Sequence, residues 1–243
     1  MRKYLIAAIA APAAIALASV AVAQNSDVSA STSVSPKKAG TKNKPKPAKI
    51  TTFVKNNIPN TTASKIEIDF PKTVKISGKG LTKCPVSAFS KPGGKANCPA
   101  KSKAGTGVSH AVLRGPAGGA GTPLNFDVTA YVSGNNLMVF YIEQQGGGVT
   151  KALQGKISKA GGKFAQKLVI TIPPDLQQPT IGLYGALNDL KTSLFNRKGM
   201  HSLISTNGCK QKKHKFGAKL TFAPNPAPPP KPSAKGSSTA KCS

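Results

Sequence analysis

Apolar and polar residues alternate along most of the middle of this chain. The clearest run spans residues 124–132, where Leu, Phe, Val, Ala and Val alternate with Asn, Asp, Thr and Tyr. Successive side chains of a strand point to opposite faces, so a period of two predicts a strand with one buried face. Ser133-Gly134-Asn135-Asn136 then supplies a turn into residues 137–143. The sequence therefore predicts a β-hairpin here.

The same alternation recurs on both sides of this hairpin. Residues 149–158 and 163–172 predict a second hairpin around a Lys-Ala-Gly-Gly turn. Residues 66–70 and 74–76 also alternate, which predicts two more strands.

A last strand is predicted near the end of the chain. His214, Phe216, Ala218, Leu220 and Phe222 share one face, opposite lysines 213, 215 and 219. Residues 200–206 are expected to pair with this strand across Asn207-Gly208, a turn-forming dipeptide.

These patterns together define a fold class. About ten short strands separated by Gly, Pro and Asn, without a long helical period, predict a single all-β, antiparallel β-sandwich. A jelly-roll-like fold or a partly closed barrel is the alternative topology. Residues 85–90 and 183–190 are expected to form short helical pieces.

Composition divides the chain into four parts. Residues 1–23 start with Arg2 and Lys3, continue with an uncharged run and end in Ala-Val-Ala, which predicts a secretory signal peptide. An uncleaved anchor is the alternative, because an apolar run of roughly 18 residues could span a membrane. Residues 24–49 are rich in Ser, Thr, Lys and Pro and are expected to form a disordered leader.

The β-sandwich domain is predicted over residues 50–222. Residues 223–243 include the run Ala227-Pro228-Pro229-Pro230-Lys231-Pro232, which favours extended polyproline geometry over a sheet. We expect Cys242 to tether this Pro-rich segment to the domain.

Export determines how the four cysteines are interpreted. A secreted or extracellular protein, including one associated with the cell wall, meets an oxidising compartment that favours disulfides. Four cysteines allow three pairings, and sequence proximity favours Cys84 with Cys98 and Cys209 with Cys242. A zinc site would need two close ligand pairs, which the sequence lacks.

Two Cys-Pro segments carry a resemblance to known proteins. Leu81–Pro85 and Asn97–Gly107 resemble uncharacterised secreted, disulfide-bonded β-rich proteins of high-GC Gram-positive bacteria. Gly208-Cys209, the strand at 213–222 and the closing Cys242 match the same group. The resemblance implies an exported disulfide-bonded β domain with no established activity. The Pro-rich segment stands where that group has a last strand, which puts the final sheet edge in doubt.

One segment suggests catalysis. Ser205-Thr206-Asn207-Gly208-Cys209-Lys210 is similar to the nucleophile motif of L,D-transpeptidases, exported enzymes that crosslink peptidoglycan with a cysteine thiolate. This chain has one extra residue between Ser205 and Gly208, no arginine after Cys209, and His201 only eight residues upstream. A cell-wall-acting enzyme of this type that uses Cys209 is therefore the alternative function.

Other catalytic or cofactor motifs are not recognised. His110, His201 and His214 lack metal-ligand spacing, and His214 is expected to be a packed side chain. Glu67 and Asp69 lie on one strand face, and a paired-carboxylate site would require the fold to bring two acids together. The remaining acids of the core are scattered: Asp127, Glu143, Asp175 and Asp189.

The glycine-rich segments also lack a cofactor signature. Residues 105–110 lack the third glycine of a dinucleotide loop, and residues 115–121 lack the Gly-Lys-Ser/Thr of a phosphate loop. Both are interpreted as turns. We therefore predict no cofactor and no metal.

The strongest compositional signal is charge. The chain has 35 Lys and Arg against 7 Asp and Glu, a net charge of +28, and only Arg2, Arg114 and Arg197 are arginine. Lysine suits diffuse attraction, whereas arginine supplies the bidentate contacts of specific base recognition. The composition therefore disfavours sequence-specific nucleic-acid binding, while simple solubility remains an alternative explanation of the charge.

The favoured hypothesis is an exported, non-catalytic β domain that associates electrostatically with anionic cell-envelope polymers or an acidic surface. The predicted contact lysines lie in the leader and after Cys209. They are Lys37, Lys38, Lys42, Lys44, Lys46, Lys49, Lys210, Lys212, Lys213 and Lys215.

Overall fold

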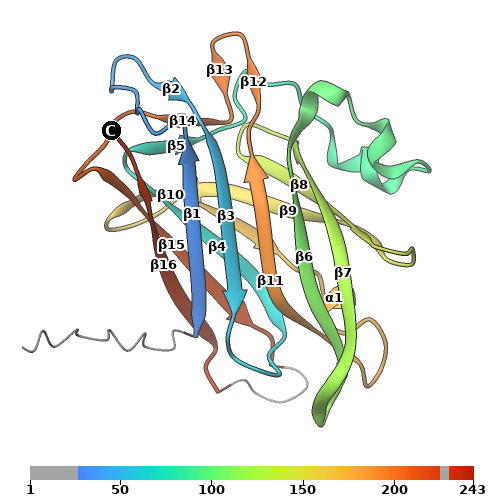
Figure 1. The fold of residues 1–243 in the computed structure, drawn as a ribbon. Coiled ribbons are helices and arrows are strands. Elements are labelled where there is room, and N and C mark those ends of the chain that lie inside the picture. Colours follow the sequence, from blue (N-terminus) through green and yellow to red (C-terminus); the bar gives the residue numbers. More distant parts are fainter. Residues whose placement is uncertain (1–26, 225–229) are drawn as a thin grey trace, which may run out of the picture.

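The computed structural model describes residues 27–224 and 230–243, and most of them belong to one antiparallel sheet of 11 strands (Figure 1). The strand order is β1-β3-β11-β6-β7-β8-β9-β10-β4-β15-β16. In chain order these strands are β1 (Val28–Ser35), β3 (Lys49–Asn56), β4 (Ala63–Pro71), β6 (Lys103–Gly115), β7 (Gly118–Val132), β8 (Leu137–Gln144), β9 (Thr150–Lys159), β10 (Phe164–Thr171), β11 (Tyr184–Leu194), β15 (Lys213–Phe222) and β16 (Ser233–Lys241). The all-β prediction is confirmed.

Smaller elements complete the fold. A three-stranded sheet has the order β2-β14-β5, and β12 pairs with β13. The remaining bounds are β2 (Lys46–Pro47), β5 (Val74–Ile76), β12 (Arg197–Lys198), β13 (His201–Ser202), β14 (Ile204–Thr206), the 3-10 helices η1 (Val86–Ser90), η2 (Gly94–Asn97) and η3 (Ala100–Ser102), and α1 (Pro174–Gln177). The helical piece expected at 85–90 is thus present as η1.

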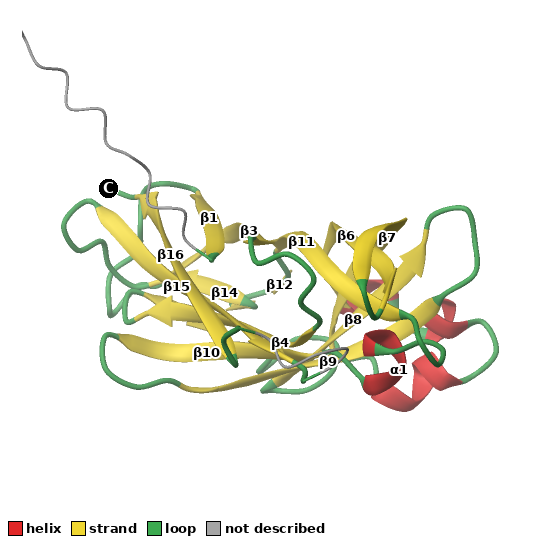
Figure 2. Ribbon diagram, turned by 90° about the horizontal axis from the view of Figure 1, so that it is seen from below, coloured by secondary structure: helices red, strands yellow, loops and turns green. Residues whose placement is uncertain are grey.

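The large sheet folds over itself into two layers. Figure 2 shows β1, β3, β11, β6 and β7 facing β4, β9 and β10 across the interior. At the open side, the edge strands β1 and β16 lie next to each other, and Thr32 Oγ1 is 2.8 Å from Ser238 Oγ. One sheet therefore supplies both layers of the sandwich.

The interior between the layers is apolar. Phe70, Met138, Phe140, Leu168 and Phe216 are all at most 2% exposed. These residues lie on β4, β8, β10 and β15, and Val54 of β3 and Leu190 of β11 in the facing layer belong to the same buried cluster. Their burial holds the layers together through the hydrophobic effect. The predicted hairpins at 124–143 and 149–172 are confirmed by the β7–β8 and β9–β10 pairs.

The predicted disordered leader is wrong for the part that the structure describes. Residues 28–35 form β1, which pairs with β3 from Val28↔Asn56 to Ser35↔Lys49. Val28 and Val34 are buried. These two β-branched side chains, together with the backbone pairing to β3 along the whole of β1, are enough to stabilise an edge strand. Residues 24–26 lie outside the described residues.

The Pro-rich segment also contains a strand. Residues 233–241 form β16, which pairs with β15 over nine residues despite the preceding prolines. Its inward residues Ala234 and Ala240 are small and buried. The prediction that this segment avoids the sheet is therefore wrong, and the doubt about a last strand is removed.

Three local predictions are also wrong. Residues 184–194 form β11 rather than a helix, and β14 pairs with β2 and β5 rather than with β15. Residues 105–110 lie inside β6 rather than in a turn. A Cβ on Gly105 would lie 1.9 Å from the carbonyl oxygen of Ser193, so this glycine permits a close approach of β6 to β11.

Two disulfides join Cys84 to Cys98 and Cys209 to Cys242, the pairing that sequence proximity favours. Such bonds are compatible with an oxidising, extracellular environment. Within residues 27–224 and 230–243, no helix is long and apolar enough to cross a membrane. The predicted signal peptide at 1–23 lies outside the described residues.

Candidate polyanion-binding surface

The two lysine-rich segments meet at one end of the sandwich. The N–H of Ser243 donates to the carbonyl oxygen of Lys37 at 2.9 Å, and the N–H of Ala39 donates to Ser243 O at 2.7 Å. The N–H of Cys242 donates to the carbonyl oxygen of Lys212 at 3.0 Å. Backbone contacts therefore connect the chain after β1, the start of β15 and the end of β16.

The small sheet β2-β14-β5 extends the same end. Lys46 on β2 pairs with Thr206, and Lys75 on β5 pairs with Ser205. The N–H of Gly40 donates to Thr206 Oγ1 at 3.2 Å, which attaches the loop between β1 and β2 to β14. The leader lysines thus belong to a folded surface instead of a free tail.

We call this surface the lysine end. It comprises the ten predicted contact lysines and three that the sequence did not single out. The thirteen are Lys37, Lys38, Lys42, Lys44, Lys46, Lys49, Lys72, Lys75, Lys210, Lys212, Lys213, Lys215 and Lys241, and every one is exposed. Lys72, Lys75 and Lys241 were missed because only the fold brings them beside the two segments.

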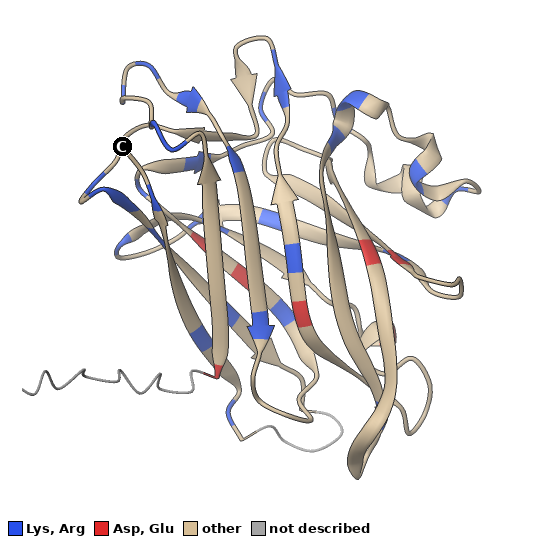
Figure 3. Ribbon diagram, in the orientation of Figure 1, with Lys and Arg blue, Asp and Glu red and all other residues tan. Residues whose placement is uncertain are grey.

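The lysine end contains no acidic side chain. All seven Asp and Glu residues lie in the described part of the chain, and the ion pairs found there involve other cations. Figure 3 shows blue segments gathered near the C-terminus and β2, while the red segments lie along other parts of the strands. The positive charges of this surface are therefore not neutralised within the protein.

A constrained turn presents part of the surface. Gln211 and Lys212 have φ of 55° and 54°, the left-handed region that non-glycine residues rarely adopt. The N–H of Lys213 donates to the carbonyl oxygen of Lys210 at 3.2 Å, which closes the turn. The Cys209–Cys242 disulfide holds the start of the turn, and the hydrogen bond from the N–H of Cys242 to Lys212 holds its end. Strained backbone conformations persist only where the surrounding structure fixes them in this way.

His214 lies directly beneath this turn. Its side chain is 1% exposed, Nδ1 is 2.8 Å from Thr73 Oγ1, and Nε2 is buried without a partner. Desolvation by burial lowers the pKa of His214, so the folded protein favours the neutral ring. The expectation that His214 is a packed side chain is confirmed, and the ring carries no charge to the lysine end near pH 7.

The transpeptidase-like segment does not offer a free thiol. Cys209 Sγ is bonded to Cys242 Sγ, and the structure contains no free cysteine among the described residues, which include all four. A nucleophilic mechanism needs a thiolate. The segment is therefore structural: it joins β14 to the start of β15.

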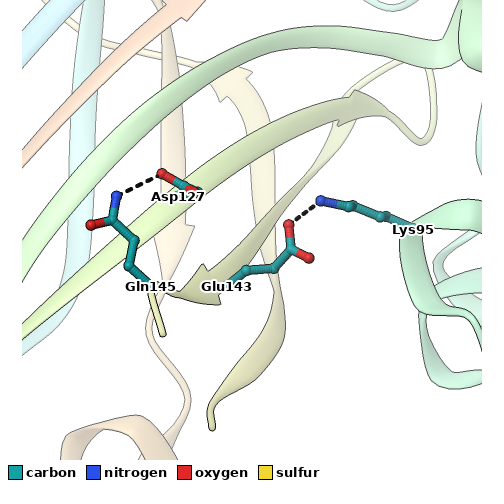
Figure 4. Close-up of polar contacts among 4 residues, drawn as sticks. All are labelled: Lys95, Asp127, Glu143 and Gln145. Atoms are coloured by element: carbon teal, nitrogen blue, oxygen red, sulfur yellow. Dashed lines mark hydrogen bonds and ion pairs between the residues drawn. The ribbon is translucent and has the colours of Figure 1, made fainter. Parts of the chain in front are cut away.

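The fold brings two acids together that the sequence left apart. Asp127 on β7 and Glu143 on β8 are directly opposite each other in the ladder. Figure 4 shows that each has its own partner: Gln145 Nε2 donates to Asp127 Oδ1 at 2.9 Å, and Lys95 forms an ion pair with Glu143. The hydrogen bond to Glu143 raises the pKa of Lys95. The two acids therefore take part in one ion pair and one hydrogen bond on the outer face of the hairpin, a structural role for both carboxylates.

The second acidic pair is Glu67 and Asp69 on β4. Lys167 Nζ is 2.9 Å from Glu67 Oε2. Burial, together with the charge of Glu67, raises the pKa of Asp69. His110 likewise binds an acid, with Nδ1 2.7 Å from Asp189 Oδ1. The described residues contain no group of three or more His, Cys, Asp or Glu side chains that could hold a metal.

Comparisons with known proteins do not assign this chain to a family: no protein-family model matches it, and no curated protein or solved structure matches it significantly. The resemblance to secreted proteins of high-GC Gram-positive bacteria stays a prediction. Functional inference rests on the lysine end itself.

Proposed function

We propose that this protein is an exported, non-catalytic β domain that binds anionic cell-envelope polymers through the lysine end. One observation carries the proposal. Segments that are more than 150 residues apart in sequence, at Lys37 and at Lys212, are hydrogen-bonded through Ser243 and Cys242 into one surface without acids.

A folded surface binds a polyanion more effectively than a free tail of equal charge. Each lysine near an anionic surface contributes about 1 kcal/mol, and the attraction decays over a Debye length of about 8 Å at physiological ionic strength. Lysines fixed on strands and a closed turn lose less backbone freedom when they bind than lysines on a disordered segment. The ordered position of the two segments therefore supports the proposal.

The residue types favour a polymer with repeated phosphates or carboxylates. Ammonium groups act as point charges that attract any anion, whereas specific recognition of planar groups uses arginine. The lysine end has no arginine. In a protein exported by the predicted signal peptide, polymers of the teichoic-acid kind or acidic lipid headgroups are the nearest partners of this class.

The test is retention on a polyanionic matrix in a salt gradient. The test variant replaces lysines of the lysine end with glutamine: Lys37, Lys38, Lys210 and Lys212. The matched control makes the same charge change at exposed lysines elsewhere: Lys55, Lys65, Lys156 and Lys191. Point substitutions are preferred to removal of residues 24–48, because β1 belongs to the sheet.

We expect the wild-type protein to elute at a few hundred millimolar salt and the test variant well before it. If each contact changes the slope of log K against log salt by about 0.7, four lost contacts reduce its magnitude by about 3. The control variant should keep nearly the wild-type slope. Equal losses in the two variants would mean that net charge alone governs binding, and retention that salt does not affect would refute an electrostatic interaction.

A further inference from the structure

An apolar cavity lies between the two layers of the sandwich. Its volume is about 310 Å³. One wall is formed by Ala111, Leu124 and Phe126 of β6 and β7, and the other by Ile66, Leu153 and Ile170 of β4, β9 and β10. Protein interiors contain few voids larger than a water molecule, so a space of this size between two packed layers needs an explanation.

Small residues keep this space open. Ala63, Ala111 and Gly185 line the cavity at positions where larger side chains would fill it. The backbone is also close by: a Cβ on Gly185 would lie 2.4 Å from the carbonyl oxygen of Leu176. The cavity thus depends on small residues in both layers and on the close contact between Gly185 and α1.

The cavity lies away from the lysine end, beside α1. Leu176 of α1 and Pro179 after it line the cavity, and Leu176 is half-buried. Lys151 on β9 forms an ion pair with Asp175, and Gln177 Nε2 donates to the carbonyl oxygen of Ile172 at 2.6 Å. These contacts hold α1 at the border of the cavity, where the half-buried side chain of Leu176 lies at its entrance.

The two polar side chains of the lining, Ser109 and Gln144, each make a hydrogen bond within the protein. Ser109 Oγ donates to the carbonyl oxygen of Asp189 at 3.0 Å, and Gln144 Oε1 accepts from the N–H of Val149 at 3.3 Å. The buried side-chain atoms without a partner in the described residues, Arg114 Nε and His214 Nε2, belong to residues outside the lining. The lining of the cavity is therefore mainly hydrocarbon and contains no charged side chain.

We propose that this cavity binds one uncharged, single-chain or ring-containing hydrocarbon ligand. Its volume is about twice that of an engineered apolar cavity of roughly 150 Å³ that binds benzene, so about twelve carbon atoms fit. It also reaches the lower range of natural ligand pockets, which starts at about 300 Å³. A two-chain lipid is too large for this space. The ligand is therefore a free molecule of about this size, and the polar end of a single-chain ligand such as an alcohol stays at α1.

The test uses N-phenyl-1-naphthylamine, an uncharged dye that fluoresces in apolar sites, and its displacement by 1-dodecanol. The wild-type protein should bind one dye per chain, with an affinity that salt does not change, and dodecanol should displace it. Ala111→Phe fills the cavity and should weaken dye binding at least tenfold. Ala120→Phe is the matched control, because Ala120 is exposed on β7 outside the cavity.

A second variant keeps the test decisive if Ala111→Phe fails to fold. Leu176→Lys places a charge at the entrance on α1 and should also weaken dye binding at least tenfold, without changing retention on a polyanionic matrix. Dye binding that survives in a folded Ala111→Phe or Leu176→Lys protein would overturn the proposal. Non-saturable binding, or an equal loss in Ala120→Phe, would overturn it too.

Discussion

The backbone N–H of Ser243 donates a hydrogen bond to the carbonyl oxygen of Lys37 at 2.9 Å. This contact links the chain after the first strand to the end of the last strand. Both flanking segments carry lysines, and the disulfide between Cys209 and Cys242 fixes the second segment one residue before Ser243. The geometry of the lysine end therefore depends on the disulfide and on the neighbouring edges β1 and β16.

The first prediction concerns this disulfide. Replacing Cys209 and Cys242 together with serine removes a covalent link across 33 residues. In the chain-entropy model this lowers the free energy of unfolding by roughly 3 to 4 kcal/mol. The double variant should also bind a polyanion several-fold more weakly, because the disulfide no longer fixes the turn at residues 210–213 beside the end of β16. Urea denaturation and salt-dependent retention measure the two effects.

The other disulfide supplies the control. The disulfide between Cys84 and Cys98 closes the segment that contains η1 and η2, which packs on the outer face of the β7–β8 hairpin, away from the lysine end. Their double replacement with serine should cost roughly 3 kcal/mol of stability but leave polyanion binding unchanged. Equal losses of binding after either replacement would show that the Cys209–Cys242 link has no specific role at the lysine end.

The second prediction tests the contact between β1 and β16. A Cβ on Gly236 would lie 2.4 Å from the carbonyl oxygen of Val28, a backbone atom that yields only if β1 moves. Gly236→Ala should therefore lower the free energy of unfolding by about 1 to 3 kcal/mol, the usual cost of overpacking. Gly161→Ala is the matched control, since nothing lies within 4 Å of its Cβ, and it should change stability by less than about 0.5 kcal/mol. Similar unfolding midpoints in urea for the two variants would contradict the close approach of the two edges.

The third prediction concerns pH. Burial lowers the pKa of His214 below its ordinary value of 6.5, so the unfolded chain binds the proton more readily than the folded protein. The stability from this group is fully present above about pH 6.5, the unfolded value, and is lost as the pH falls from there toward the lower folded pKa. The loss is at most about 1.4 kcal/mol per pH unit for one proton.

His214→Gln removes this titration while keeping a side chain that can hydrogen-bond to Thr73. Unfolding free energies from urea titrations between pH 7 and pH 5 should fall more steeply for the wild-type protein than for the variant. The comparison cancels the contributions of carboxylates such as Asp69, which are common to both proteins. Parallel curves would show that burial does not shift the pKa of His214.

The central strands could be predicted from the sequence because each has large residues on one face. Phe216 and Leu220 on β15, for example, alternate with lysines and lie in the core. The pattern could not reveal β16 because its inward residues, Ala234 and Ala240, are small, and it could not reveal β1 because Val28 and Val34 are its only large apolar side chains. An edge strand needs less buried apolar area to be stable, because backbone hydrogen bonds to its neighbour, β3 for β1 and β15 for β16, hold it in the sheet.

The prediction for residues 183–190 failed for a different reason. β11 contains a register shift between Leu187 and Asp189. Because of the extra residue, the side chains after it point to the opposite face of the sheet from the one that strict alternation predicts. Leu187 and Leu190 consequently both line the interior cavity although they are three residues apart, a spacing that resembles a helix. A bulge of this kind depends on the neighbouring strand β6, so local sequence does not show it.

The same limit applies to the candidate surface. Ten of its lysines could be predicted because they cluster in two segments, but their meeting depends on contacts between residues such as Ala39 and Ser243. Lys72 and Lys75 lie in the patterned core sequence, where only the pairing of β5 with β14 reveals their position. The cavity likewise arises from two layers that are distant in sequence.

The most direct measurement of the central claim is an amide chemical-shift map of the isotope-labelled protein titrated with a soluble glycerol phosphate polymer. We predict that the shifts cluster at the loop between β1 and β2, the turn at 210–213 and the end of β16, and that they reverse when salt is added. Shifts spread evenly over exposed lysines on all strands, or concentrated at distant ones such as Lys55 and Lys191, would contradict binding at the lysine end.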